Sequence, residues 1–208
     1  MNIPNIGLPR VVIIGGGFGG LKLAQKLKNA PFQVVLLDKH NYHAFQPLLY
    51  QVATAGLEPG SIAYPFRKIF RNQQRMFFRM ALVNSVDTNA REVHTDIGTV
   101  HYDYLVMATG ATSNFFGLKS IEEFAMPMKT VSDALDIRSL MLQNLEKALL
   151  GKDAAEQEAL MSVIIVGGGP TGVELAGALS ELKKDILPSD YPDMNIGEMD
   201  IHLVEANP

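Results

Sequence analysis

Short apolar runs rich in β-branched residues alternate along this chain with stretches in which apolar residues recur at helical spacing. The first kind is typical of strands buried on both faces, and the second is typical of amphipathic helices. The same order of strand, helix and strand occurs near each end of the chain. The expected strands are 10–14, 33–37, 161–166 and 201–205, and the expected helices are 19–29 and 171–184. Because a helix connects parallel strands in this way, the pattern predicts an α/β fold.

The first half of the middle region is less regular. Residues 41–61 are rich in aromatic residues, proline and glycine, and they predict a functional loop or a broken helix. Residues 61–71 resemble a short helix. Three strand-like runs follow at 76–87, 92–95 and 100–108, with a turn near 96–98.

The second half of the middle region is mainly helical in pattern. A long amphipathic helix is expected at 132–150, with Ser132 as its N-cap and Gly151 as its C-cap. Residues 152–159 are polar and favour a helix. An excursion that contains proline and aspartate, 187–200, precedes the last strand.

A glycine-rich fingerprint opens the first expected helix. It reads VVIIGGGFGG over 11–20. In such a motif Gly15 permits the tight turn, Gly17 lets the backbone approach a pyrophosphate, and Gly20 allows the helix to pack closely on the strand. The pyrophosphate lies on the helix N-terminus, where free N–H groups and the helix dipole favour negative charge. Asp38 ends the next strand, 23 positions after Gly15, where its carboxylate can accept hydrogen bonds from ribose hydroxyls.

A second fingerprint, VIIVGGGPTG over 163–172, opens the last expected helix. The three glycine roles fall to Gly167, Gly169 and Gly172. Pro170 stands near the helix start, where its missing N–H costs little. The acid is Glu205, 38 positions after Gly167 rather than about 20, and the excursion 187–200 accounts for the excess. An acid here repels the 2′-phosphate of NADP, so the sequence favours NAD.

Two fingerprints predict two Rossmann-like dinucleotide-binding domains, an FAD/NAD(P)-binding fold that is incomplete at both domains in this chain. The expected division is 1–112 and 113–208, with the helix 132–150 leading the second domain. Two bound nucleotides indicate electron transfer from one to the other. Glu174 lies in the second fingerprint helix, and the residues leave two interpretations of it open. It is either a solvated helix residue or a polar group near a nicotinamide.

Composition narrows the chemistry. The formal net charge is −4 and the basic residues are scattered, which gives no reason to expect nucleic acid. The chain has no cysteine, so it forms no disulfide, thiolate metal site or cysteine nucleophile of its own. His40 and His43 are three positions apart without a carboxylate partner and are interpreted as polar loop residues, so no metal site is predicted. No signal peptide or membrane-spanning run is expected.

Four segments together resemble the type II NADH dehydrogenases, single-chain FAD-containing NADH:quinone oxidoreductases. They are LLDKHNYHAFQPLLYQVATAGLEP (36–59), YDYLVMATGA (102–111), KTVSDALDIR (129–138) and IIVGGGPTGVELAGALSEL (164–182). The FQPLLYQVATAG segment is the specific one, because many flavoproteins with two dinucleotide domains share the fingerprints and the ATG strand end.

The resemblance implies FAD and NADH as cofactors and assigns residues to each. The positions that match the family's FAD site are Gly15, Gly17, Phe18, Gly19, Gly20, Asp38, Lys39, Val83, Ala108, Thr109 and Gly110. The positions that match its NADH site are Gly167, Gly169, Pro170, Thr171, Gly172 and Glu205, with Glu174 as the catalytic candidate beside the nicotinamide. Pro47, Leu48 and Thr54 match a loop near the flavin ring and the quinone pocket.

The implied reaction passes a hydride from NADH to FAD and then two electrons to a membrane quinone, without proton pumping. The implied location is peripheral, on the cytoplasmic side of the inner or plasma membrane, through a C-terminal region that would follow residue 208; a homodimer is compatible with the family. That region would also bring the second FAD motif and a quinone-contacting glutamine segment, so the 208 residues alone are expected to be inactive.

Two alternatives stay open at this point. One is an NADH-dependent flavoprotein reductase of ferredoxin or another soluble acceptor, which shares both fingerprints. The other is a nucleotide sensor without turnover, which the elaborate 41–60 loop disfavours. Disulfide reductases and sulfide:quinone reductases use redox cysteines, and this chain has none.

Overall fold

The structure is a computed structural model that describes residues 1–151 and 153–206. Packing divides it into two compact units, one formed by Met1–Ala44 with Ala63–Thr112 and the other by Phe45–Ile62 with Ser113–Pro208. The loop between the two stretches of the first unit therefore packs in the second. That the functional domains divide at residue 112 stays a prediction.

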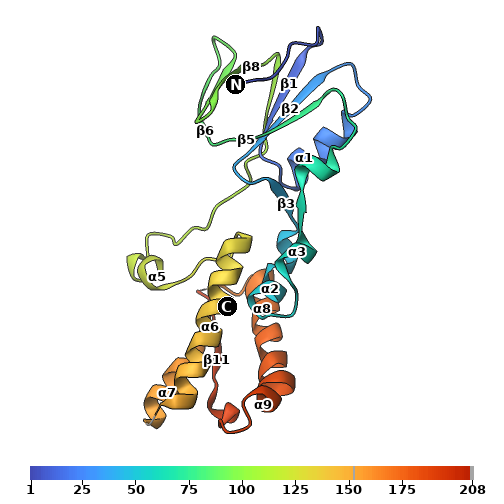
Figure 1. Cartoon of the computed structure of the whole chain (residues 1–208). Coiled ribbons are helices and arrows are strands. Elements are labelled where there is room, and N and C mark those ends of the chain that lie inside the picture. The colour runs from blue at the N-terminus through green and yellow to red at the C-terminus, as the bar shows by residue number, and fades with distance from the viewer. Residues whose placement is uncertain (152, 207–208) are drawn as a thin grey trace. The chain divides into compact units, whose positions relative to one another are not determined.

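A four-stranded parallel sheet forms the centre of the first unit (Figure 1). Its strand order is β5 (Met76–Met80), β2 (Gln33–Asp38), β1 (Arg10–Ile14) and β9 (Tyr104–Met107). Both faces of β1 and β2 are apolar, as the unbroken runs predicted, and alternate residues pack against different layers. Val11 and Ile13 face a core with Phe66, whereas Val12 and Ile14 face a second core.

The two faces of this sheet have different covers. Helices α1 (Phe18–Lys26) and α4 (Phe66–Ile69) lie on one face, where Ala24 and Phe66 join the first core. A three-stranded antiparallel sheet covers the other face and contributes Val93 and Val100 to the second core. Its strands are β6 (Val83–Asp87), β7 (Glu92–Thr95) and β8 (Gly98–His101).

The expected long strands 76–87 and 100–108 are each two strands in different sheets. The first leaves the parallel sheet after Met80: Ala81 N donates to Asp38 O at 2.8 Å, and Leu82 N then turns to the Asp96 side chain. The expected helix 61–71 was also wrong in part. Residues 61–62 end the short helix α3 (Pro59–Ile62), the next three form β4 (Ala63–Pro65), which pairs with β3 (Tyr42–Ala44), and the helix α4 follows.

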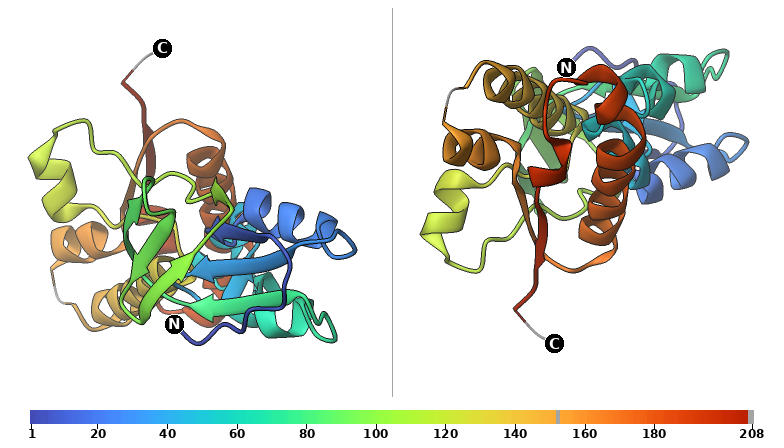
Figure 2. Two further views of the ribbon diagram at one scale, coloured as in Figure 1. Left: turned by 90° about the horizontal axis from the view of Figure 1, so that it is seen from above. Right: turned by 90° about the horizontal axis from the view of Figure 1, so that it is seen from below.

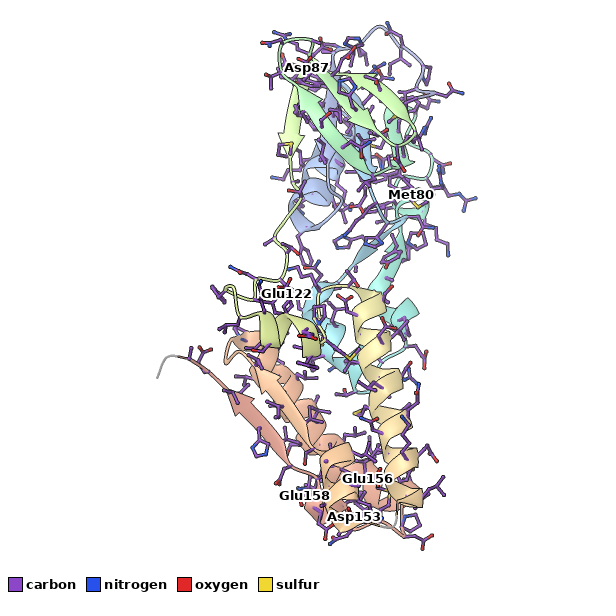
Figure 3. The ribbon with its side chains drawn as sticks, turned by 90° about the vertical axis from the view of Figure 1, so that its left-hand side faces the viewer. Met80, Asp87, Glu122, Asp153, Glu156 and Glu158 are labelled. Atoms are coloured by element: carbon purple, nitrogen blue, oxygen red, sulfur yellow. The ribbon has the colours of Figure 1, made fainter. Side chains whose placement is uncertain are left out.

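Asp87 forms the turn that joins β6 to β7, where Figure 3 labels it. Its Oδ1 accepts hydrogen bonds from Ala90 N at 2.8 Å and Asn89 N at 2.9 Å. These backbone donors, Ala90 first, hold the pKa of the Asp87 carboxyl below its ordinary value. The Asp87 side chain thus supplies the hydrogen-bond acceptor for two backbone N–H groups of this turn.

The second unit contains two parallel strands, β10 (Val163–Val166) and β11 (Ile201–Val204), joined through helix α8 (Pro170–Glu181). Helix α8 packs against both strands, and α6 (Val131–Leu150) packs against α7 (Ala154–Met161) (Figure 2). The helices bury one face of the strand pair. The core residues are Leu145, Ala148, Met161, Ile165, Leu179, Leu182, Leu187, Ile196 and Met199.

The excursion 187–200 is folded against this core. Helix α8 continues through a π-helical turn, η2 (Leu182–Ile186), into α9 (Leu187–Asp190), and η3 (Ile196–Glu198) follows. Lys183 Nζ donates to Met199 O at 2.5 Å and to Gly197 O at 3.2 Å. These bonds close the excursion, so β11 returns beside β10 despite the long connection.

The segment 41–61, expected as a loop or broken helix, begins with β3 and continues as a series of short helices. They are η1 (Gln46–Leu48), α2 (Leu49–Ala53) and α3 (Pro59–Ile62), and a further short helix of this unit is α5 (Lys119–Phe124). Leu49, Val52 and Ala53 are buried in the unit. Across residues 1–151 and 153–206, none of the helices has the length and hydropathy needed to span a bilayer.

The start of α6 corrects one prediction. Its N-cap is Thr130, not Ser132: Thr130 Oγ1 accepts from Asp133 N at 3.1 Å, and Asp133 Oδ2 accepts from Thr130 N at 2.9 Å. This reciprocal pair is a capping box, and Ser132 is exposed within the first turn. Gly151 does follow the helix, but its backbone is extended (φ −66°) rather than left-handed.

The capping box gives a direct stability test. Thr130→Ala should lower the free energy of unfolding by about 1 kcal/mol, because Asp133 N loses its acceptor. Ser132→Ala is the matched control and should change that free energy by less than about 0.5 kcal/mol. Urea denaturation followed by circular dichroism measures both. A larger loss for Ser132→Ala than for Thr130→Ala would contradict the assignment of the cap.

Candidate dinucleotide-binding sites

The first glycine turn closes tightly on its neighbours. Gly15 N donates to Leu37 O at 2.8 Å, and Gly15 has a φ of +100°, which disfavours any side chain. A Cβ at Gly20 would lie 1.9 Å from Gly15 O, so the helix could not approach the strand with any other residue there. Ala108, at the end of β9, packs beside this turn. A Cβ at Gly15 would meet its carbonyl oxygen at 2.3 Å.

Asp38 holds the turn from the end of β2. Its Oδ2 accepts from Gly16 N at 2.6 Å, and its Oδ1 accepts from His40 N at 2.7 Å. Each carboxylate oxygen has more than one lone pair, so a ligand hydroxyl can share this half-buried group. Lys39 beside it is exposed. The carboxylate therefore lies where the fingerprint needs a ribose acceptor.

The outer side of the turn is open. A Cβ at Gly17 or Gly19 would find no atom within 4 Å, and both residues are exposed. Helix α1 begins at this point with Gly17 as its N-cap, without a side-chain cap and without an acidic residue in its first turn. Its first N–H groups have no partner within the helix and favour an anion. This glycine cradle, helix terminus and carboxylate fit the pyrophosphate and ribose of FAD.

The second glycine turn repeats the construction in the other unit. Gly167 N donates to Val204 O at 2.8 Å, and Gly167 has a φ of +113°. A Cβ at Gly172 would lie 2.0 Å from Gly167 O. Glu205 Oε2 accepts from Gly168 N at 2.7 Å, as Asp38 does from the corresponding glycine of the first turn. Glu205 thus occupies the same place beside its turn as Asp38 does, although it comes 38 positions after the first glycine rather than 23.

The open side of the second turn also matches the first. Gly169 is the N-cap of α8, Pro170 occupies the first turn and Thr171 is exposed. A Cβ at Gly169 would find no atom within 4 Å, and the first turn of α8 has no acidic residue. Glu174, further along α8, is exposed and makes no hydrogen bond or ion pair with the described residues. Its catalytic role stays a prediction.

The remaining predicted residues lie at several places. Val83 is half-buried in β6, while Thr109 and Gly110 are exposed just after β9. The three residues predicted near the quinone belong to the second unit, and they are Pro47 and Leu48 in η1 and Thr54 at the end of α2. Thr54 is buried, and its Oγ1 donates to Tyr50 O at 3.0 Å. Within the described part of the chain, no group of three metal-ligating side chains forms a metal site.

Sequence reasoning missed the residues that fix Gly16. A Cβ at Gly16 would lie 2.1 Å from the ring of Phe66, which is fully buried. His43 Nδ1 lies 2.9 Å from Gly16 O, so His43 is not merely the polar loop residue that the sequence indicated. The run of three glycines, Gly15 to Gly17, was a usable signal, because the fingerprint itself does not require the middle one.

Comparison with known proteins agrees with this geometry. Residues 9–208 match the family model described as pyridine nucleotide-disulphide oxidoreductase. Two type II NADH:quinone oxidoreductases of Mycobacterium tuberculosis are 42% and 38% identical to the chain over 97% and 96% of its length. The chain spans 44% of the length of each of these relatives.

A solved structure shows the same fold. NDH2 of Plasmodium falciparum in complex with NADH superimposes with a TM-score of 0.89 at 25% identity, over 96% of this chain and 42% of that one. The parallel sheets, the two glycine turns and the match over residues 9–208 establish that this chain belongs to the pyridine nucleotide-disulphide oxidoreductase family.

Proposed function

We propose that the chain binds FAD at the first glycine turn and NADH at the second, as part of an FAD-dependent NADH:quinone oxidoreductase. The observation that carries this proposal is the repeated turn: each has an open glycine at a helix N-terminus and an acid bonded to the turn. The similarity to type II NADH:quinone oxidoreductases selects the reaction among flavoproteins with two such turns. FAD, when bound, would supply the redox chemistry that links oxidation of NADH by hydride transfer to two-electron reduction of the quinone.

The residues of this chain bind and orient the two nucleotides. The N-terminus of α1 neutralises one pyrophosphate and Asp38 accepts from one ribose, whereas α8 and Glu205 serve the other nucleotide. Glu174 is proposed as the polar group beside the nicotinamide. The predicted quinone-side residues, Pro47, Leu48 and Thr54, belong to the segment of short helices 46–53 and its end.

The proposed acceptor also sets the proposed location. Membrane quinones are lipid-soluble, so the enzyme would work as a peripheral protein at the cytoplasmic side of a membrane, in a respiratory chain. The proposed domains follow the fingerprints, with 1–112 for FAD and 113–208 for NADH. A homodimer stays a prediction.

An anaerobic titration tests the two nucleotide sites together. The chain is reconstituted with FAD, freed of excess flavin, and titrated with NADH while the visible flavin band is followed. Retained flavin that bleaches with one equivalent of NADH is the expected result if both sites assemble. Retained flavin that NADH does not bleach would contradict hydride transfer within this chain. A chain that retains no flavin would contradict FAD binding by these residues.

Two matched substitutions separate the sites. Gly17→Asp and Gly169→Asp each place a favourable N-cap residue where backbone angles and space permit it (φ −65° and −68°). The new carboxylate would repel a pyrophosphate. Gly17→Asp should fold and lose flavin, while Gly169→Asp should keep flavin that NADH no longer bleaches. Thermal unfolding of both apoproteins is the control, and flavin retention by Gly17→Asp would contradict the first site.

Glu205 gives a test of nucleotide selectivity. Glu205→Gln keeps an oxygen acceptor for Gly168 N but removes the charge that would repel a 2′-phosphate. The ratio of NADPH to NADH affinity, measured by nicotinamide fluorescence, should rise about ten-fold. Glu181→Gln, at the far end of α8, is the control and should leave that ratio unchanged. An unchanged ratio for Glu205→Gln would remove Glu205 from the nucleotide site.

A further inference from the structure

The peptide groups on either side of Gly16 are held from three elements. Asp38, at the end of β2, accepts from Gly16 N at 2.6 Å, and Phe66 of α4 leaves no room for a side chain at this position. His43 of β3 completes the set, with its Nδ1 2.9 Å from Gly16 O. Gly16 itself is buried, whereas Gly17 on its outer side is exposed.

The hydrogen bond from His43 to Gly16 O also fixes the direction of the next N–H group, that of Gly17. A peptide unit is planar and trans, so the C=O of Gly16 and the N–H of Gly17 point in opposite directions. Since the C=O is directed at His43, the N–H of Gly17 is directed away from His43. Gly17 is also the N-cap of α1, beside the open space where a pyrophosphate fits. The orientation of Gly17 N–H, one donor of the glycine turn, therefore depends on His43, which is not a residue of the fingerprint.

The contact with Gly16 O requires a hydrogen atom on Nδ1 of the His43 imidazole. A carbonyl oxygen only accepts, so Nδ1 of His43 carries the hydrogen atom. The ring is further fixed by Phe18, which it meets edge-on with ring centroids 5.2 Å apart and planes at 82°. Phe18 lies in the first turn of α1, so His43 contacts both sides of Gly17 along the chain.

Among the described residues, none holds the second glycine turn as His43 holds the first. Gly168 N donates to Glu205, as Gly16 N does to Asp38. Gly168 O, however, accepts no hydrogen bond from a side chain of the described residues. The two turns thus share the acid that holds the N–H but differ in what holds the C=O.

We infer that His43 is a positioning residue of the first site: its Nδ1–H holds the Gly16 carbonyl and thereby presents Gly17 N–H to the FAD pyrophosphate. This inference rests on the proposed function, because it assigns FAD to the first turn. A preorganised turn loses less freedom when it binds its ligand. The first turn, held from both sides of Gly16, is therefore suited to a cofactor that stays bound.

Two variants of His43 separate the hydrogen bond from the ring. His43→Phe keeps an aromatic ring against Phe18 but has no donor, whereas His43→Asn keeps an N–H donor near the position of Nδ1 but has no ring. FAD affinity is measured by titrating the apoprotein and following the quenching of flavin fluorescence. His43→Phe should weaken FAD binding about three- to ten-fold, and His43→Asn should stay within two-fold of the parent chain.

The controls locate the effect. His101→Phe changes a largely exposed histidine of β8 and should leave FAD affinity unchanged. NADH affinity, measured by nicotinamide fluorescence, should be the same in both His43 variants, because the second turn lacks this anchor. Loss of FAD affinity in His43→Asn but not in His43→Phe would assign the effect to ring packing and overturn the inference. Equal FAD affinity in all variants would overturn it as well.

A readout without cofactor keeps this test separate from that of the proposed function. In the ¹⁵N-labelled apoprotein, the amide resonance of Gly17 should shift in His43→Phe and stay near its original position in His43→Asn. Failure of the parent chain to bind FAD would contradict the proposed function, while the Gly17 resonance would still decide on the anchor. An unmoved resonance in His43→Phe would refute the positioning role.

Discussion

The contact on which both sites depend is the close approach of a helix to the turn that precedes it. The last glycine of each fingerprint, Gly20 or Gly172, lies very close to the carbonyl oxygen of the first glycine of that fingerprint. A Cβ added to it would lie 1.9 Å from Gly15 O in one turn and 2.0 Å from Gly167 O in the other. This approach puts the N-terminus of the helix directly above the carboxyl ends of two parallel strands. The N–H of the first glycine then donates to a carbonyl oxygen at the end of the second strand, Leu37 O in one unit and Val204 O in the other, at 2.8 Å in both. Without that geometry, neither acid could reach its turn.

The two units share the strand–turn–helix segment but differ in what covers the faces of its strands. In the first, the parallel sheet is covered on both faces, by helices on one and by a three-stranded sheet on the other. In the second, the helices cover one face of β10 and β11, while Ile164 and Val166 are exposed. Two bonds of the glycine turn are nevertheless the same in both units: the first glycine donates to the second strand, and the middle glycine donates to the acid. The turn is thus determined by the strand–helix–strand segment itself and does not require a particular cover on the sheet.

The sequence predicted these segments well because their information is local. Unbroken β-branched runs, glycines at fixed spacing and an acid after the second strand each act within one strand–turn–helix segment. Predictions failed where a contact from a distant residue decides the structure. Ala81 N donates to Asp38 O where β5 ends, although the sequence predicts one continuous strand from Met76 to Asp87. His43 bonds to Gly16 across 27 positions, and neither residue type suggests the other in the sequence.

The helix starts with a side-chain cap differ from those at which nucleotide binding is proposed. A helix start leaves N–H groups without intrahelical partners, and a side chain or a ligand must satisfy them. Helix α6 uses Thr130 as its N-cap and has Asp133 in its first turn. Helix α7 likewise uses Asp153 as its N-cap and has Glu156 in its first turn, and Figure 3 labels both residues.

Helices α1 and α8 do the opposite. Each begins at a glycine without a side-chain cap, and neither has an acid in its first turn. An acid there would both occupy the N–H groups and repel a phosphate. Among the residues that the structure describes, the carboxylates bonded to these turns are those of Asp38 and Glu205, which follow or end the neighbouring strands and hold the glycine before the N-cap. A chain of net charge −4 is therefore compatible with the two proposed anion sites, because the field at each helix start is set locally.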